Sequence, residues 1–215
     1  LSPLILGVMP PTFAIAGKLT REYLLPPNNG GVRLDSPGGN LLYAVGGLAV
    51  WDSSIAMISN VNPGYPREWV MDFNQRGLDT GGIHFNSENN QADLRSFIAY
   101  TDVNERSGTN AVSHFARREM TFPKSLLGYH PRDETVKDLR ETDPLAPVAR
   151  HVPKEYRDIH YIHLCPFDFT SQSQLVNLFK GGSSHAISLD PAPGYMKPAF
   201  WRELRVVLGG VTAFL

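Results

Sequence analysis

The sequence has little of several features that mark whole classes of proteins. It contains one cysteine, Cys165, which excludes a framework of disulfide bonds within the chain and favours a reducing cytoplasm. Its 20 basic and 21 acidic residues leave a net charge of -1, which provides no general attraction to nucleic acid or anionic lipid. The longest apolar run, Leu41–Trp51, is too short to span a bilayer and contains two glycines. We therefore expect a cytoplasmic protein with neither a nucleic-acid nor a membrane partner.

The two ends of the sequence look internal to a longer protein. Leu1–Gly7 is apolar but carries no basic leader and no initiator methionine, so we predict an internal start and not a signal peptide. At the other end, Val211–Leu215 is typical of a buried β-strand, and no residues follow it. Ligands of an open α/β sheet lie beyond the carboxyl ends of its strands, so the residues after such a strand would enter the site. We therefore expect a chain that is truncated at its carboxyl end.

Apolar runs of strand length recur along the chain and alternate with helical patterns. The predicted strands are 12–16, 54–59, 160–164, 186–189 and 211–215. This alternation is typical of the α/β class, in which a mostly parallel, doubly wound sheet has helices on both faces. A chain of 215 residues, 42% of them hydrophobic, is long enough to bury the core of one such domain. We expect residues 1–215 to form a single, incomplete domain.

Three helices are expected between these strands. Pro66–Arg76 ends at Gly77, which suits the glycine position just beyond a helix. A second helix precedes Gly181–Gly182 and is predicted to be capped by Thr170 or Ser171. A third helix begins near Pro198, since proline suits a first turn. Its inward-facing residues are predicted to be Phe200, Trp201, Leu204 and Leu208.

Two stretches break the alternation of strands and helices. Residues 23–35 and 95–115 mix apolar and polar side chains around turn-rich segments and are typical of hairpins. We predict that they pair in one small sheet, apart from the main sheet. Residues 120–156 are polar and contain five prolines, so we expect an excursion with short helices only.

Some apparent motifs fail for physical reasons. Gly17–Lys18 resembles the end of a phosphate-binding loop, but no hydroxyl residue follows the lysine to reach magnesium. His160 and His163 are three apart on a predicted strand, which places their rings on opposite faces, so we predict no metal site. Cys165 lies just beyond this strand and could act as a nucleophile, but a buried, unreactive thiol is the alternative.

The most informative pattern is a pair of glycines before a helix, within Ser36–Val45. Glycines in this position let the backbone approach a ligand, and the start of the helix presents free N–H groups. A tight turn between loop and helix is the simpler alternative for the same residues.

In this context the sequence resembles the PfkB or ribokinase family of sugar and nucleoside kinases. The resemblance rests on an ordered set of segments, none of them specific alone, and covers most of the chain. The segments are Phe13–Gly17, Lys18–Glu22, Pro37–Asn40, Ile55–Ser59, Val61–Pro66, Arg76–Ile83 and Leu189–Pro193. The resemblance implies a ribokinase-like α/β fold with a small β-sheet lid, and the hairpin-like stretches 23–35 and 95–115 fit that lid.

The resemblance also implies which residues bind the substrate. Glu22 would hold sugar hydroxyls from the junction with the lid, although a solvated charge beside Arg21 is the alternative. The expected substrate-binding residues are Thr20, Glu22, Gly38, Gly39, Asn40, Tyr43, His163, Cys165 and Asp190. Glu22 stands where the family usually has aspartate and Tyr43 where ribose-specific members have asparagine, which argues against ribose as the substrate.

The function implied by the resemblance is transfer of phosphate from ATP to a hydroxyl group of a sugar or nucleoside. Family members bind ATP and Mg²⁺ and take their catalytic base from segments that would follow Leu215. We therefore expect the substrate-binding part of a kinase, with no catalytic residue and no bound cofactor of its own. The alternative is a non-catalytic sugar-binding or regulatory module derived from such a kinase. Exposed edges of the lid could also pair two copies into a homodimer.

Overall fold

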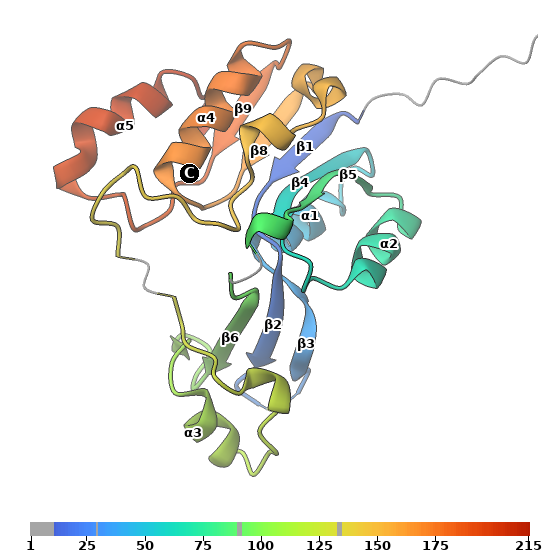
Figure 1. Cartoon of the computed structure of the whole chain (residues 1–215), viewed down its shortest axis with the longest axis vertical. Coiled ribbons are helices and arrows are strands. Elements are labelled where there is room, and N and C mark those ends of the chain that lie inside the picture. Colours follow the sequence, from blue (N-terminus) through green and yellow to red (C-terminus); the bar gives the residue numbers. More distant parts are fainter. Residues whose placement is uncertain (1–10, 29, 90–91, 133–134) are drawn as a thin grey trace, which may run out of the picture.

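The computed structural model describes residues 11–28, 30–89, 92–132 and 135–215, shown in colour in Figure 1. The expectation of an internal start at Leu1–Gly7 lies outside these residues. Within the described part of the chain, no helix has both the length and the apolar composition needed to cross a membrane.

The main sheet has six strands, and every pairing in it is parallel. In spatial order they are β10 (Ala213–Phe214), β9 (Ala186–Leu189), β8 (Tyr161–Leu164), β1 (Phe13–Ala16), β4 (Ile55–Val61) and β5 (Asp79–Phe85). The predicted parallel sheet is therefore confirmed, and β5 is an additional strand. β1 lies at the centre between β8 and β4, which explains why Ala14 and Ala16 are fully buried.

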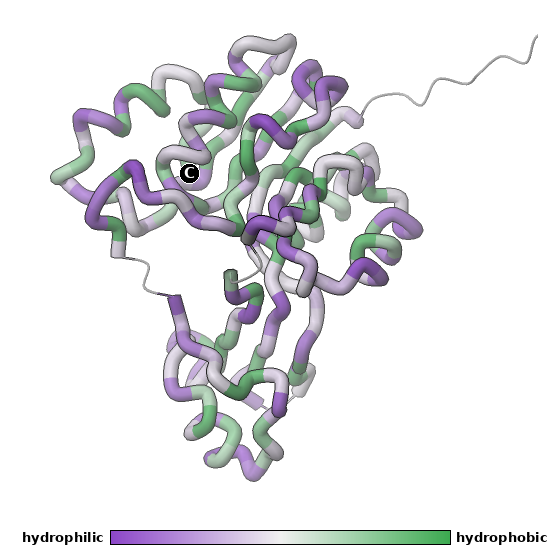
Figure 2. The backbone as a smooth tube through the Cα atoms, in the orientation of Figure 1, coloured by the Kyte–Doolittle hydropathy of each residue, from purple (hydrophilic) through white to green (hydrophobic). Residues whose placement is uncertain are grey.

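Helices cover both faces of this sheet, as the alternation predicted (Figure 1). α1 (Asn40–Leu48) and α2 (Arg67–Gln75) pack on one face, and α4 (Phe169–Lys180) and α5 (Trp201–Leu208) pack on the other. Side chains of a strand point alternately to opposite faces, so neighbours on β1 enter different cores. Figure 2 shows hydrophobic segments along the strands of the main sheet and hydrophilic segments on the outer turns of the helices.

Two details of the helices differ from the sequence-based expectations. α4 is capped by Asp168 and not by Thr170 or Ser171, because the Asp168 carboxylate accepts a hydrogen bond from the Ser171 amide at 2.8 Å. The inward face of α5 is formed by Leu204 and Val207, whereas Trp201 is 65% exposed and Phe200 and Leu208 are not buried. Leu204 is thus buried as predicted, whereas Phe200 belongs to a 3₁₀ turn (Pro198–Phe200) that precedes α5.

The two hairpin-like stretches form one separate small sheet, which confirms their predicted pairing. Its order is β3 (Arg33–Gly38), β2 (Thr20–Leu25), β6 (Arg95–Tyr100) and β7 (Arg106–Ser107). β2 pairs antiparallel with β3 and parallel with β6. Figure 1 shows this sheet projecting from the end of the main sheet at which β1 leads into β2.

One face of the small sheet is covered by residues of the same chain. The second stretch ends in the short helix α3 (Ala111–Ala116) and not in a strand, because Phe115 is drawn into an apolar cluster beneath the sheet. The buried members of this cluster are Tyr23, Leu25, Phe97, Ala99, Phe115 and Leu126. This face of the small sheet is therefore already occupied within one chain.

The helices found among the described residues of the excursion at 120–156 are short, as expected. They are 3₁₀ turns: η2 (Lys124–Leu126), η3 (Ala149–His151) and η4 (Lys154–Asp158), the last of which ends just beyond the excursion. A similar turn, η1 (Ser87–Asn89), follows β5. The excursion links the small sheet to the main sheet, so its middle part passes the ends of the main strands.

The last strand, β10, lies at the edge of the main sheet beside β9. The expectation of a buried strand at Val211–Leu215 is wrong in this respect, since Phe214 is 41% and Leu215 72% exposed. An edge strand has a neighbour on one side only, and its apolar side chains stay open to solvent.

Candidate ligand-binding cavity

The strand order changes direction between β1 and β8. The chain first adds β4 and β5 on one side of β1 and then returns to add β8, β9 and β10 on the other side. The loops that leave β1 and β8 therefore separate at this point and leave room between them. In open α/β sheets this is the position at which ligands bind, beyond the carboxyl ends of the strands.

Two glycines let α1 begin directly against the end of β1. Gly39 has φ +103°, and a Cβ atom there would overlap the carbonyl oxygen of Lys18. A Cβ at Gly17 would lie 2.8 Å from the Asn40 side-chain oxygen and 3.0 Å from the Cys165 sulfur. The glycines thus bring the start of α1 against the loop after β1, and the Leu41 amide donates to the Lys18 carbonyl at 3.3 Å.

Asn40 joins the two strand ends across the point of separation. Its Oδ1 accepts a hydrogen bond from the backbone N–H of Lys18 at 2.7 Å, and its Nδ2 donates to the carbonyl of Pro166 at 2.6 Å. Both ends of the amide are therefore used to hold the residues after β1 and β8 in place. This is a positioning role.

A cavity of about 590 Å³ lies at this place. Its walls come from the ends of β1, β8 and β9, from the start of α1 and from the excursion. The charged residues in the walls are Lys18, Asp93, Arg132, Glu141, Asp143 and Asp168, and the other wall residues include Asn40, Pro166, Phe167 and Tyr195. The cavity is large enough for a small molecule, and its wall combines a largely apolar surface with a few charged groups that can bind oxygen atoms.

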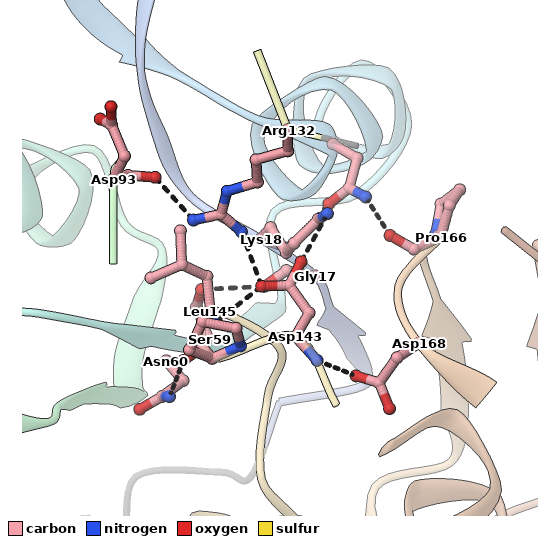
Figure 3. A network of polar contacts seen from close by, with 12 residues as sticks. Gly17, Lys18, Ser59, Asn60, Asp93, Arg132, Asp143, Leu145, Pro166 and Asp168 are labelled. Carbon is pink, nitrogen blue, oxygen red and sulfur yellow. Dashed lines mark hydrogen bonds and ion pairs between the residues drawn. The ribbon is translucent and has the colours of Figure 1, made fainter. Parts of the chain in front are cut away.

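Asp143 is the centre of a polar network in this wall (Figure 3). Its Oδ2 lies 3.0 Å from the Lys18 ammonium, and its Oδ1 lies 2.7 Å from the Arg132 guanidinium and accepts from the Leu145 amide at 2.9 Å. Burial opposes ionisation, but the two cations lower the pKa of Asp143 below its ordinary value. Asp143 is thus a carboxylate that holds the excursion against β1.

Asp168 fastens the same segment from the other side. One carboxylate oxygen caps α4, and the other accepts a hydrogen bond from the Asp143 backbone N–H at 3.1 Å, as Figure 3 shows. Burial raises the pKa of Asp168 above its ordinary value. Arg132 also donates to the carbonyl of Asp93 at 2.6 Å, so the loop is tied to both sides of the cavity.

Glu22 and Tyr43, two of the predicted site residues, bind each other. The Tyr43 hydroxyl lies 2.7 Å and 2.9 Å from the two Glu22 carboxylate oxygens, and the Arg33 guanidinium lies 3.5 Å away. Glu22 is 1% exposed, so it is not a solvated charge, and Arg21 pairs with Asp35 instead. Burial and the carboxylate raise the pKa of Tyr43 to about 12, so the phenol remains a donor.

The predicted residues at the ends of β8 and β9, namely His163, Cys165 and Asp190, also contact neighbouring residues of the chain. The His163 ring lies 2.9 Å from the Ser188 hydroxyl, and burial lowers its pKa. Burial and, secondarily, Asp190 raise the pKa of the Cys165 thiol to about 12, which favours the unreactive thiol over the nucleophile. The backbone of Asp190 is held between Leu164 and Gln172.

Of the nine predicted residues, Asn40 is the one in the cavity wall. Thr20 and Glu22 lie on β2, Gly38 and Gly39 before α1, and the remaining residues on α1 or at the ends of β8 and β9. Sequence reasoning missed Lys18, Arg132, Asp143 and Asp168. Asp168 follows a predicted strand closely and could have been found by that position, whereas Arg132 and Asp143 lie in the excursion, where no periodic pattern marks them.

Among the residues that the structure describes, no group of three or more His, Cys, Asp or Glu side chains could hold a metal ion. Three of the four acidic groups around the cavity are tied to cations or backbone amides: Asp93 pairs with Arg95, Asp143 with Lys18 and Arg132, and Asp168 accepts from the backbone amides of Asp143 and Ser171. The described part of the chain therefore contains no assembled set of three protein ligands for a metal ion.

Comparison with solved structures places this fold among known ones. The chain is similar to a fructokinase from Xylella fastidiosa with bound ATP (TM-score 0.58, 16% identity), covering 94% of this chain and 57% of that one. It is similar to an E. coli protein assigned as ribokinase II (0.57, 16%, 94% and 60%), also solved with ATP and Mg²⁺, and to a PfkB protein from Polaromonas sp. (0.54, 11%, 93% and 62%). No protein-family model and no curated protein matches the sequence.

These similarities establish the fold. The chain has the ribokinase-like α/β fold of PfkB and ribokinase-type sugar kinases, as its sequence suggested, and spans about 60% of the length of the chains that it matches. The main parallel sheet and the separate small sheet both belong to this architecture.

Proposed function

We propose that this chain is the substrate-binding part of an ATP-dependent kinase that transfers phosphate to a hydroxyl group of a sugar or nucleoside. The observation that carries the proposal is the cavity of about 590 Å³ beside β1 and β8, with Lys18, Asn40 and Asp143 in its wall. Ammonium and carboxylate groups suit the hydroxyl groups of a ligand, and the apolar part of the wall suits its carbon skeleton.

In this proposal the described residues form one domain, and the small sheet acts as its lid. One face of the lid is occupied by α3 and the residues that follow, so this face is closed to a second copy. Two copies could instead join through the edge strands β3 and β7. Light scattering at high protein concentration tests this part of the proposal. A monomer at every concentration contradicts it.

Glu22 has a conditional role in this proposal. A ligand hydroxyl that binds its carboxylate competes with the Tyr43 hydroxyl for the same two oxygens. If this exchange takes place, Glu22→Ala weakens ligand binding by roughly ten- to a hundredfold, the range for a hydrogen bond to a charged group. If Glu22→Ala leaves the affinity for the ligand unchanged, Glu22 has a structural role only.

ATP and Mg²⁺ are the cofactors of the proposed activity. The described residues contain no assembled set of three protein ligands for a metal ion, so we derive no step of phosphate transfer from them. The role proposed for this chain is to bind the acceptor molecule, orient its hydroxyl groups and exclude water from it.

A non-catalytic sugar-binding or regulatory module remains the second candidate, because the matched kinases are longer than this chain. One experiment separates the two. Phosphate transfer from ATP to a panel of pentoses, hexoses and nucleosides is measured for the 215-residue chain and for the full-length encoded protein, with calorimetry of binding for both. Transfer by the full-length protein alone supports the kinase. Binding without transfer by either supports the module, and transfer by the 215-residue chain contradicts our assignment to the substrate-binding part.

A further inference from the structure

Lys18 lies in the cavity wall, and not all N–H donors of its ammonium are used within the described residues. Its ammonium donates to Asp143 Oδ2 at 3.0 Å, which is its one hydrogen-bond partner among the described residues. An ammonium carries three N–H donors. Its side chain is 27% exposed, and the cavity is the space that it borders. Donors therefore remain available to a molecule inside the cavity.

The position of this ammonium is well determined. The Lys18 backbone N–H is held by Asn40 and its carbonyl accepts from Leu41, so the peptide units on both sides of the residue are fixed. Asp143 directs the side chain, and Asp143 is itself fastened by Arg132 and by the Leu145 amide, as Figure 3 shows. A donor fixed before the ligand arrives loses little conformational freedom on binding.

The charges around Lys18 select against an anionic ligand. Asp143 lies between two cations, 3.0 Å from the Lys18 ammonium and 2.7 Å from the Arg132 guanidinium. Asp93, Glu141 and Asp168 are further carboxylates in the same wall, so its four carboxylates outnumber its two cations. A phosphate group that approached Lys18 would compete with Asp143 and face like charges, which disfavours binding. A hydroxyl oxygen can accept from the spare N–H donors without disturbing the ion pair.

We propose that Lys18 is a specificity-determining residue of the cavity, which donates hydrogen bonds to hydroxyl oxygens of an uncharged polyol and disfavours phosphorylated forms of the same molecule. This inference rests on the proposed function and narrows its substrate class to free sugars or nucleosides. Lys18 donates to the oxygen atoms of the ligand, and the ion pair with Asp143 holds the ammonium in place.

The first test uses the unmodified protein. Acetylation of each lysine by an amine-reactive reagent is followed by mass spectrometry, with and without free hexoses, pentoses or adenosine, the corresponding monophosphates, inorganic phosphate and ATP. We expect at least one uncharged polyol to slow the acetylation of Lys18 several-fold and to leave the exposed Lys154 unchanged. Equal or stronger protection by a phosphorylated ligand, or no protection by any polyol, overturns the proposal.

The second test compares variants by calorimetry with the protecting polyol. We expect Lys18→Met to weaken its binding about tenfold, with Lys154→Met as the control that does not change it. Asp143→Asn is expected to improve binding of the monophosphate relative to the free polyol, because it removes the competing charge. Unchanged polyol affinity in Lys18→Met overturns the proposal even if the full-length protein transfers phosphate. Absence of phosphate transfer refutes the kinase assignment but leaves the labelling result for Lys18 valid.

Discussion

The sharpest structural prediction concerns Gly39, where the chain turns from β3 into α1. With φ +103°, a Cβ atom at this position would overlap the Lys18 carbonyl oxygen and lie 3.0 Å from the Leu19 Cα. Strained backbone of this kind costs about 1–3 kcal/mol in an alanine variant. Both neighbours are backbone atoms that cannot rotate away, so overpacking adds about 1–3 kcal/mol.

Gly39→Ala should therefore lower the free energy of unfolding by about 2–6 kcal/mol, a large part of the about 5–15 kcal/mol typical of a folded protein. Urea unfolding followed by circular dichroism measures this change. The matched control is Gly47→Ala in the same helix, where a Cβ atom meets nothing within 4 Å. That variant should gain about 0.4–1 kcal/mol, because alanine loses less conformational entropy.

A loss below about 0.5 kcal/mol at Gly39, an effect ordinary for a surface substitution, would refute the reasoning. It would mean that α1 can shift away from β1 without penalty. The contacts of Asn40 with Lys18 and Pro166 would then not determine the shape of the cavity.

Three further predictions concern groups near the sheet end. Glu22→Ala should lower the free energy of unfolding by about 1.5–3 kcal/mol, because the Tyr43 hydroxyl loses its charged partner; an unchanged urea midpoint contradicts this. Burial lowers the pKa of His163 and His151 in the folded chain, so the unfolded chain binds protons more readily and stability should fall as the pH decreases below about 6.5. A urea midpoint as high at pH 5.5 as at pH 7.5 would disprove this loss of stability at low pH. Cys165 should react with iodoacetamide at pH 8 at least about a hundredfold more slowly in the native protein than in urea, and equal rates would show an accessible thiol.

Much of the fold could be predicted from local patterns in the sequence. Apolar runs separated by amphipathic helices indicate a parallel sheet, since strands buried on both faces need continuous apolar side chains. The glycine pair before Asn40 indicates a close approach of backbone, because the residues that permit it are adjacent in the chain. The parallel sheet and the close backbone approach both depend on residues near one another in the chain, and the structure contains both.

Other properties were decided by the tertiary structure alone. The Lys18–Asp143 ion pair joins residues 125 positions apart, one of them in a proline-rich segment without a periodic pattern. The engagement of Glu22 by Tyr43, and the exposure of Trp201 where a buried face was predicted, depend on how elements rotate and pack. Residue types and spacing along the chain therefore determined the architecture of this protein. The wall of its cavity was decided by long-range contacts, because a side chain finds its partner only after the chain has folded.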